Sequence, residues 1–188
     1  RQCGYNSAMI PFASFFLAGF ECSTQRRRDG RRLDLIASTH HDCFALIDYA
    51  RCRAAGLRTV RDGLRWHLIE ARAGYYDFTS VLPQLRAARE TGIEVLWDLF
   101  HYGWPDDLDL FSAAFVTRFA AFARAFTRLV IEETGRAPLV APINEISFVA
   151  WGAGEDGFLN PFTLGRSREI KTQLVRAAIA AIAAIWEV

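Results

Sequence analysis

Apolar residues recur at helical spacing through the middle of the chain. In FVTRFAAFARAFTRLV, residues 115–130, they fall at steps of four and three, which places them on one face of an α-helix. Ser112 can cap the start of this helix, and Gly135 can end it in the left-handed conformation that glycine adopts at low cost. The predicted face consists of Phe115, Phe119, Phe122, Phe126 and Leu129.

Two earlier segments repeat this pattern of a capping residue, an apolar face and a closing glycine. One helix is predicted to begin at Asp42 and to end at Gly56. Another is predicted to begin at Thr79 or Ser80 and to end at Gly92. Its apolar side carries Leu82, Leu85 and Ala88.

A short strand-like segment follows each closing glycine. These segments are LRTVRDGLRW (57–66), IEVLWDLFHY (93–102) and APLVAPINE (137–145), and FFLAGFE (15–21) predicts one more strand before them. The last two segments are nearly continuous apolar runs, as expected of parallel strands covered on both faces. Strands that alternate with helices imply right-handed crossovers and an α/β fold. The alternation alone does not distinguish a doubly wound sheet from a barrel.

Two apolar stretches near the chain ends need a decision between a packed element and a targeting or membrane segment. AMIPFASFFLAGF, residues 8–20, is long enough for the core of a signal peptide, but Pro11 interrupts it and an acid follows, which favours the strand. AAIAAIAAIW, residues 177–186, is well short of the ~20 apolar residues of a membrane span. We therefore predict a packed helix there and no membrane partner.

Composition and charge describe an ordinary globular domain. The chain has 188 residues, of which 52% are hydrophobic and 23% charged, so we expect residues 1–188 to form one domain. A net charge of +1 gives no field that would attract nucleic acid. The run RRRDGRR, residues 26–32, is the local exception; it is interpreted as a solvated loop, with a phosphate-binding loop as the alternative.

The cysteines and the glycine motifs exclude several other classes. Cysteines at positions 3, 22, 43 and 52 form neither a CxxC pair nor a dense disulfide framework. We therefore expect reduced thiols, a cytoplasmic protein and no metal site. Neither GxGxxG nor GxxxxGK[ST] follows a predicted strand, so no cofactor is predicted and a barrel becomes the better interpretation of the fold.

Polar and aromatic side chains collect at the predicted carboxyl ends of the strands, where parallel α/β folds place their functional groups. Sugar hydroxyls take paired hydrogen bonds and the apolar faces of pyranoses stack on indoles, so this mixture suits a carbohydrate, although another polar cleft could contain it too. The residues are Glu21, Gln25, Arg61, Asp62, Arg65, Trp66, Asp98, His101, Trp104, Asn144, Glu145 and Trp151.

Glu145 interrupts an otherwise apolar run, residues 137–151. A buried carboxylate without a partner is costly, so this position indicates either an ion pair, for example with Arg61, or a chemical use. A general acid must hold a proton at its working pH, which apolar surroundings favour. Such surroundings would come from Ile143, Ile146 and Phe148.

Four motifs carry a family resemblance: VRDGLRWHLIE (60–70), GYYDFTSVLPQLRAARETGIEVL (74–96), LFHYGWPDDL (99–108) and PINEIS (142–147). Together they resemble the first half of a retaining β-glycosidase of glycoside hydrolase clan A, and family one, the β-glucosidase family, is the most similar pattern. The resemblance extends over residues 12–188. It implies a (β/α)8 TIM barrel of which about the first four βα units are present, so that the chain would be the N-terminal half of one barrel.

The resemblance also implies roles for individual residues. Glu145 would be the general acid and base, Asn144 would bind the 2-hydroxyl of the sugar, Arg61 would hold the nucleophile carboxylate, and His101 would bind a glycone hydroxyl. A β-linked glycoside or oligosaccharide is the expected substrate. Three tryptophans at the strand ends are candidates for stacking on it, namely Trp66, Trp104 and Trp151.

Some positions depart from the family pattern and leave the substrate preference open. Ile146 stands where a proline usually follows Asn-Glu, Tyr102 and Gly103 stand where Trp-Asp is usual, and Asp62 and Gly63 replace an aromatic residue and a serine.

The nucleophile of this clan ends the seventh strand, and eight βα units need ~250 residues. No residue here can therefore be assigned that role by resemblance. The chain would be a fragment, or a half-barrel that pairs with a second half-barrel chain or another copy of itself, with little activity alone. Two other classes stay open: a noncatalytic carbohydrate-binding or assembly half-barrel, and an α/β enzyme that uses Glu145 as a base.

Overall fold

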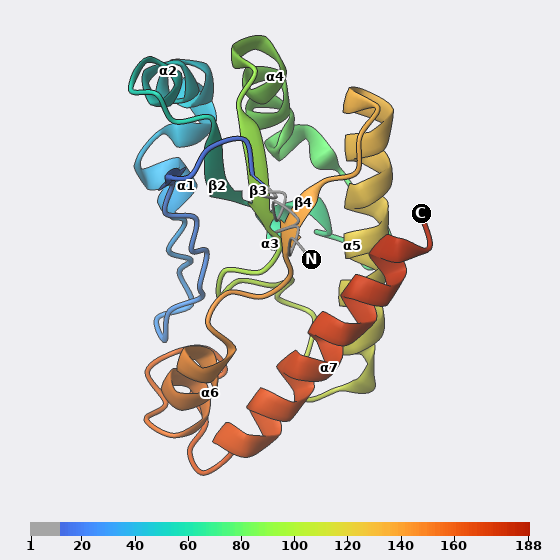
Figure 1. Cartoon of the computed structure of the whole chain (residues 1–188). Coiled ribbons are helices and arrows are strands. Elements are labelled where there is room, and N and C mark those ends of the chain that lie inside the picture. Colours follow the sequence, from blue (N-terminus) through green and yellow to red (C-terminus); the bar gives the residue numbers. More distant parts are fainter. Residues whose placement is uncertain (1–11) are drawn as a thin grey trace, which may run out of the picture.

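A computed structural model describes residues 12–188 as a four-stranded parallel sheet with helices packed on its outer face (Figure 1). The strands lie in chain order, so each βα unit adds its strand beside the previous one. This arrangement is part of a (β/α)8 barrel, and it confirms the predicted fold class and all four predicted strands. The strands are β1 Leu17–Gly19, β2 Thr59–Gly63, β3 Glu94–Asp98 and β4 Leu139–Ala141.

The structure contains all the long helices that hydrophobic periodicity predicted, together with short helices that it did not predict. The predicted helices correspond to α2 (His41–Ala54), α4 (Leu82–Thr91), α5 (Ala113–Thr134) and α7 (Ser167–Trp186), and α7 packs against α5 (Figure 1). The sequence did not predict four further elements, which are α1 Leu35–Ser38, α3 Trp66–Ile69, the 3-10 turn Phe78–Ser80 and α6 Ile146–Gly154.

The helix ends confirm the predicted glycines better than the predicted caps. Gly92 and Gly135 end α4 and α5 with φ of 67° and 69°, in the left-handed region. Ser112 occupies the N-cap position of α5, but its hydroxyl donates to the carbonyl of Asp109 instead of capping the helix. The start of α2 lies one residue before Asp42.

The second strand is shorter than predicted. It ends at Gly63, and the chain then turns so that Trp66 opens the short helix α3. A strand continuing to Trp66 was therefore wrong. The next two strands are also shorter than predicted, because β3 ends at Asp98 and β4 at Ala141, before Asn144 and Glu145. The side chains of the outward-facing strand residues pack on the helices, as Trp97 does against Phe126 of α5, with ring centroids 5.4 Å apart.

The two terminal stretches can be compared with their predictions only in part. Residues 8–11 of the first apolar stretch, like Cys3, lie outside the described residues. Within residues 12–188, no helix combines the length and the apolar character needed to cross a bilayer.

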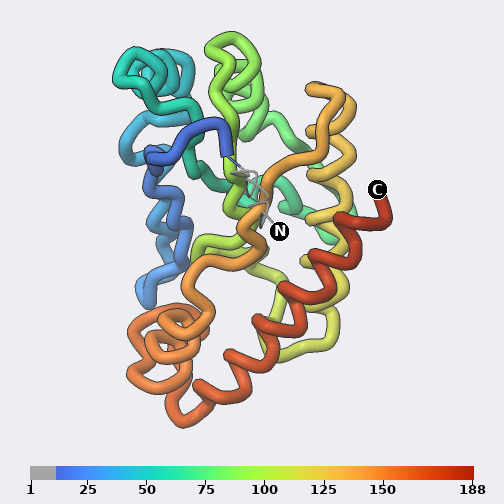
Figure 2. Tube along the Cα trace, viewed as in Figure 1, coloured from blue at the N-terminus to red at the C-terminus, as the bar shows by residue number. Residues whose placement is uncertain are grey.

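The basic run forms a tight loop that rests on the segment after α6 (Figure 2). The backbones of Arg26 and Arg32 form an antiparallel β-bridge across the loop, and the side chain of Arg28 donates to the carbonyl of Gly157. Arg32 also donates to the carbonyl of Thr24, at 2.6 Å, and only 16% of its side chain is exposed. The interpretation as a solvated loop thus fits residues 26–31, which are exposed, but not Arg32.

A buried histidine fastens α2 to the outer face of β2. His41 is 3% exposed, and its two ring nitrogens lie 2.8 Å from carboxylate oxygens of Asp48 and Asp62. Tyr49 donates to the same Asp62 oxygen at 2.5 Å. Because both nitrogens face acceptors, both must carry hydrogen, so the ring is an imidazolium. Burial alone would lower the pKa of His41, but Asp62 and then Asp48 outweigh it and raise that pKa above 6.5.

This ion cluster predicts a stability that falls with rising pH. A raised folded-state pKa gives stabilisation that is complete below the unfolded value of 6.5 and is lost as pH rises through the folded value. We expect the free energy of unfolding, measured with urea between about pH 6 and pH 9, to decline over this range and His41→Gln to flatten the decline. His40→Asn, at the exposed neighbouring position, should leave the decline intact; if it alone abolishes it, the assignment to His41 is wrong.

Candidate functional site

The carboxyl ends of the strands converge on one buried carboxylate, Asp98, which ends β3 and is fully buried. Arg61, from the middle of β2, donates from Nη2 to Asp98 Oδ2 at 2.6 Å. The Nδ1 atom of His101, three residues beyond the strand, lies 3.0 Å from the same oxygen. Alternation along the strands turns Arg61 and Asp98 to the inner face of the sheet.

Asn144 extends this network to the end of β4. Its backbone N–H donates to the carbonyl of Phe100, which ties the segment to the end of β3, and its side chain is nearly buried. The amide oxygen accepts from Arg61, while Nδ2 lies 3.1 Å from both His101 Nε2 and the hydroxyl of Tyr102. Because Nδ2 can only donate, Nε2 of His101 is the acceptor in this arrangement, and Nδ1 carries the proton that Asp98 accepts.

Glu145 is joined to the network through Tyr102, whose hydroxyl donates to Oε2 of Glu145. Both residues adopt left-handed backbone conformations, with φ of 45° for Glu145 and 66° for Tyr102, which non-glycine residues rarely do. Burial, and then the hydrogen bond to Glu145, raises the pKa of Tyr102 well above its ordinary value. The phenol therefore stays protonated and keeps its proton available to Glu145.

Glu145 is not buried as the sequence indicated. Its side chain is exposed, and the apolar residues expected around it, Ile143, Ile146 and Phe148, are only partly buried themselves. The reason is topological: the carboxylate faces the inner side of an open sheet, which the elements within residues 12–188 do not cover. An ion pair between Glu145 and Arg61, the simpler explanation of this acid, does not form, because Arg61 binds Asp98 and Asn144 instead.

The other polar residues predicted to lie at the strand ends are found on both sides of the sheet and in the basic loop. Glu21 lies on the inner side, 3.4 Å from His101 Nε2. Burial would raise the pKa of Glu21, but the N–H of Ser23 and the nearby His101 outweigh it and lower that pKa. Asp62 faces α2, as described above, and Arg65 pairs with Asp42 at 3.0 Å, so both stabilise the outer layer. Gln25 lines a separate concavity of about 330 Å³ with the basic loop.

Two of the three candidate tryptophans lie in the core. Trp66 is fully buried, stacks on Phe122 and donates from Nε1 to Glu70. Trp104 is 5% exposed, stacks on Phe100 and donates to the carbonyl of Leu108. Neither indole has a free face for a sugar, so the stacking role predicted for these two residues is dropped.

Trp151 differs, because it is 46% exposed on α6. It packs edge-on against Phe158, with ring centroids 5.1 Å apart, and lies 5.7 Å from Phe148. Phe148 in turn contacts Tyr102, at 5.6 Å between ring centroids. An aromatic strip therefore leads from the Glu145 network to the exposed indole.

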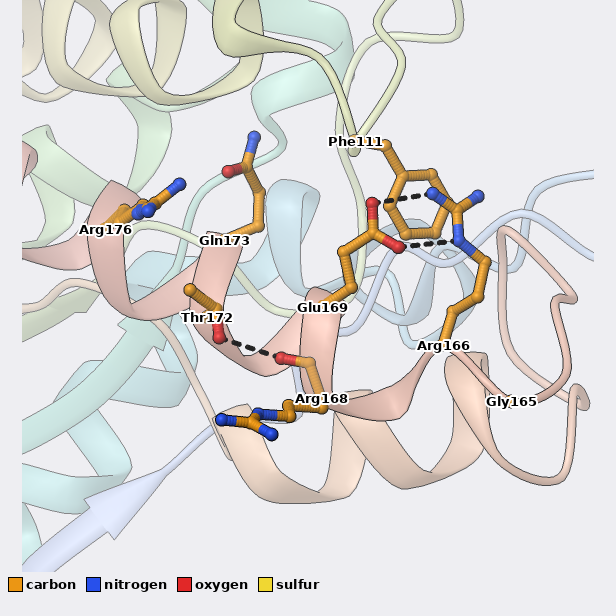
Figure 3. Close-up of a pocket in the computed structure, with 8 residues that line it drawn as sticks. All are labelled: Phe111, Gly165, Arg166, Arg168, Glu169, Thr172, Gln173 and Arg176. Atoms are coloured by element: carbon orange, nitrogen blue, oxygen red, sulfur yellow. Dashed lines mark hydrogen bonds and ion pairs between the residues drawn. The ribbon is translucent and has the colours of Figure 1, made fainter.

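A larger concavity, about 470 Å³, lies at the start of α7 and is lined by arginines (Figure 3). Arg166 lies over the ring of Phe111 and forms two hydrogen bonds with Glu169, and Figure 3 shows this pair facing one another on the same side of the helix. None of the strand-end residues described above lines this concavity. The chemistry-bearing side chains of the strand ends are thus gathered elsewhere.

Reasoning from the sequence missed two members of the site. Tyr102 was considered only as a departure from a family pattern, and Cys22 only as one of several thiols. Cys22 is buried, and its Sγ lies 3.2 Å from Nδ1 of His101. Burial, and then the charge of Asp98, raises the pKa of the Cys22 thiol far above its ordinary value. The clue for both residues was their position at a predicted strand end.

Comparison with solved structures agrees with the fold. No protein-family model matches the sequence, and no curated protein matches it. A β-glucosidase from Thermotoga maritima in complex with methoxycarbonyl-substituted glucoimidazole superposes with a TM-score of 0.71 at 17% identity, covering 94% of this chain and 47% of that one. A family 1 β-glucosidase from the same organism in complex with isofagomine lactam gives 0.68 at 19% identity over 78% of this chain.

An enzyme designated AHE from Alicyclobacillus herbarius also gives a TM-score of 0.68, at 18% identity. The chain covers 35% of that structure and of the isofagomine lactam complex, so it spans less than half of each of these relatives. At such identities the similarity establishes the fold, a partial TIM barrel.

The position of Cys22 leaves no space for a side chain at Gly63. A Cβ at Gly63 would lie 2.2 Å from Cys22 Sγ and 2.5 Å from its Cβ, closer than atoms can approach. We expect Gly63→Ala to lower the free energy of unfolding in urea by ~1–3 kcal/mol. Gly19→Ala, in the adjacent strand, meets no atom within 4 Å and should change it by less than about 0.5 kcal/mol. Equal effects of the two substitutions would contradict this placement of Cys22.

The bond between Tyr102 and Glu145 predicts a linked titration. Glu145→Gln replaces a charged acceptor by a neutral one, so the pKa of Tyr102 should fall, while burial keeps it above 10. A fluorinated tyrosine at position 102, followed by ¹⁹F NMR, would bring this titration to milder pH. Glu155→Gln, at the exposed far end of α6, is the control. A Tyr102 midpoint that Glu145→Gln leaves unmoved would show that the two side chains do not interact in solution.

Proposed function

We propose that this chain provides the acid and base half of a retaining β-glycosidase site, with Glu145 as the proton donor and acceptor. The observation that carries the proposal is the hydrogen-bonded placement of Glu145 in the loop between β4 and α6, on the same edge as Arg61 and His101. Active sites of (β/α)8 barrels lie at this edge. The similarity in fold to β-glucosidases supports the same reaction class.

The geometry around Glu145 suits proton transfer. Tyr102 donates to Oε2, and within residues 12–188 no group donates a hydrogen bond to Oε1. One oxygen of the carboxyl group is thus held in place while the other can protonate a glycosidic oxygen and later deprotonate water. We assign Tyr102 the part of a positioning residue, because it acts on the substrate only through Glu145.

The neighbouring residues would bind the sugar. Asn144 Nδ2 donates to Tyr102 and lies against His101, so a 2-hydroxyl would bind by replacing one of these acceptors. His101 is 12% exposed and would bind another hydroxyl of the glycone. The exposed indole of Trp151, at the end of the aromatic strip, is the remaining stacking candidate. The substrate would be a β-linked glycoside or oligosaccharide.

The nucleophile would come from outside these 188 residues. Retention requires a second carboxylate about 5–5.5 Å from the acid and base. Arg61 has room for such a partner, because only Nη2 binds Asp98 and Asn144, and Nη1 donates to no group within residues 12–188. The carboxylate would be supplied by a longer form of this chain, a second half-barrel chain or another copy, any of which would pair with the open edges of β1 and β4.

Kinetics of the complete protein test this assignment. Residues 1–188 would be expressed within the complete open reading frame that encodes them and assayed with aryl β-glucosides. We expect Glu145→Gln to lower kcat/KM by ~10²–10⁴ for a poor leaving group and much less for an activated one, which needs no proton. Azide, as a small nucleophile, should restore part of the second step. Glu155→Gln is the matched control.

Other outcomes would reject parts of the proposal. An unchanged kcat/KM in Glu145→Gln would remove Glu145 from the chemistry. Sugar binding without hydrolysis by the complete protein would select the noncatalytic carbohydrate-binding half-barrel. The 188-residue chain alone should not turn over aryl β-glucosides, and turnover that Glu145→Gln abolishes would mean that the nucleophile lies within it.

A further inference from the structure

Three potential metal ligands meet beneath the proposed sugar site. Cys22 follows β1, Asp98 ends β3, and His101 lies three residues later. Their sulfur, oxygen and nitrogen atoms all lie within 4.8 Å of one another. Cys22 and Asp98 are buried and His101 is nearly so, which distinguishes this cluster from a chance grouping of surface acids.

The hydrogen bonds within this cluster leave atoms without a proper partner. His101 Nδ1 lies 3.2 Å from Cys22 Sγ and 3.0 Å from Asp98 Oδ2. In a neutral ring this nitrogen carries either one proton or one lone pair, so it can form a full hydrogen bond with only one of the two atoms. Asp98 Oδ1 is buried and has no hydrogen-bond partner in the described part of the chain. An unmatched carboxylate oxygen in the interior is unfavourable, and a cation would satisfy it.

The local charge also favours a cation. Besides burial, the negative charges of Asp98, Asp62 and Glu21 raise the pKa of the Cys22 thiol. The positive charge of Arg61 lowers this pKa but does not outweigh them. Arg61 binds Asp98 through Oδ2, so Oδ1 can become a ligand without breaking that ion pair.

The surroundings of His101 match those of a metal-bound histidine. Such histidines generally donate their second ring N–H to a carboxylate or carbonyl, which fixes the tautomer. If Nδ1 binds a metal, the ring proton moves to Nε2, and Oε1 of Glu21 lies 3.4 Å from that nitrogen. Asn144 would then turn its amide oxygen, or give up its contact with Nε2.

We propose that Cys22, Asp98 and His101 bind one divalent transition-metal ion, with Zn²⁺ as the ion that this ligand set fits best. Thiolate, imidazole and carboxylate are all zinc ligands, and a water molecule would complete the tetrahedron from the open side. The thiol proton leaves to solvent when the sulfur binds. Ligand atoms around zinc lie roughly 3.3–3.8 Å apart, so the observed 3.2 Å between Cys22 Sγ and His101 Nδ1 requires a shift of a few tenths of an ångström.

Metal binding to the 188-residue chain tests this site independently of any glycosidase activity. A background variant with Cys3, Cys43 and Cys52 all changed to Ser leaves Cys22 as the sole thiol. We expect the reduced variant to bind one equivalent of Co²⁺ with a thiolate-to-cobalt charge-transfer band, and Zn²⁺ to displace it. Adding Cys22→Ser should abolish the band and weaken Zn²⁺ binding by at least ~100-fold, more than loss of an outer partner usually does.

Two further variants separate ligation from folding. His101→Gln removes a second ligand and should lower Zn²⁺ affinity to a similar extent, whereas Glu21→Gln removes only the outer partner and should cost about 10–100-fold. Circular dichroism verifies that each variant is folded, and if Cys22→Ser is not, the His101 variant decides. Absence of the charge-transfer band in the background variant, or a band that survives the loss of His101, overturns the proposal.

Discussion

A buried negative charge organises the inner edge of this sheet. Asp98 is fully buried, and a carboxylate there is tolerable only if donors surround it. Arg61 from β2 and His101 from the β3 loop provide them, and Asn144 from the end of β4 binds both of these residues. Three consecutive strands are thereby tied together at one point.

The hydrogen bonds of this network form a chain that ends at Glu145. Arg61 and His101 fix the orientation of the Asn144 amide, the amide donates to Tyr102, and Tyr102 donates to Glu145. The left-handed backbones of Tyr102 and Glu145 present these side chains to each other, and such conformations persist only where the surroundings impose them. The inner end of this network is buried and rigid, and its outer end, at Glu145, is exposed.

The family resemblance and the strand-end rule predicted which segments carry polar groups but not which way they face. Glu145, Asn144, His101 and Arg61 do gather on one edge. Trp66 and Trp104 have the same residue type and similar positions in their motifs, yet their indoles fill the core beside the phenylalanines of α5. The turn between β2 and α3 is enough to move Trp66 from the strand end into the core, and no local sequence pattern predicted this turn.

The sequence by itself determined the order of the strands and the long helices along the chain, because hydrophobic periodicity and helix-ending glycines are local properties of the chain. It also determined that acidic and amide residues follow the strands. Only the tertiary structure decided that Glu145 is exposed, that Tyr102 is its partner, and that Cys22, Asp98 and His101 meet. Those facts depend on contacts between residues up to 79 positions apart, which the sheet brings together through its parallel register.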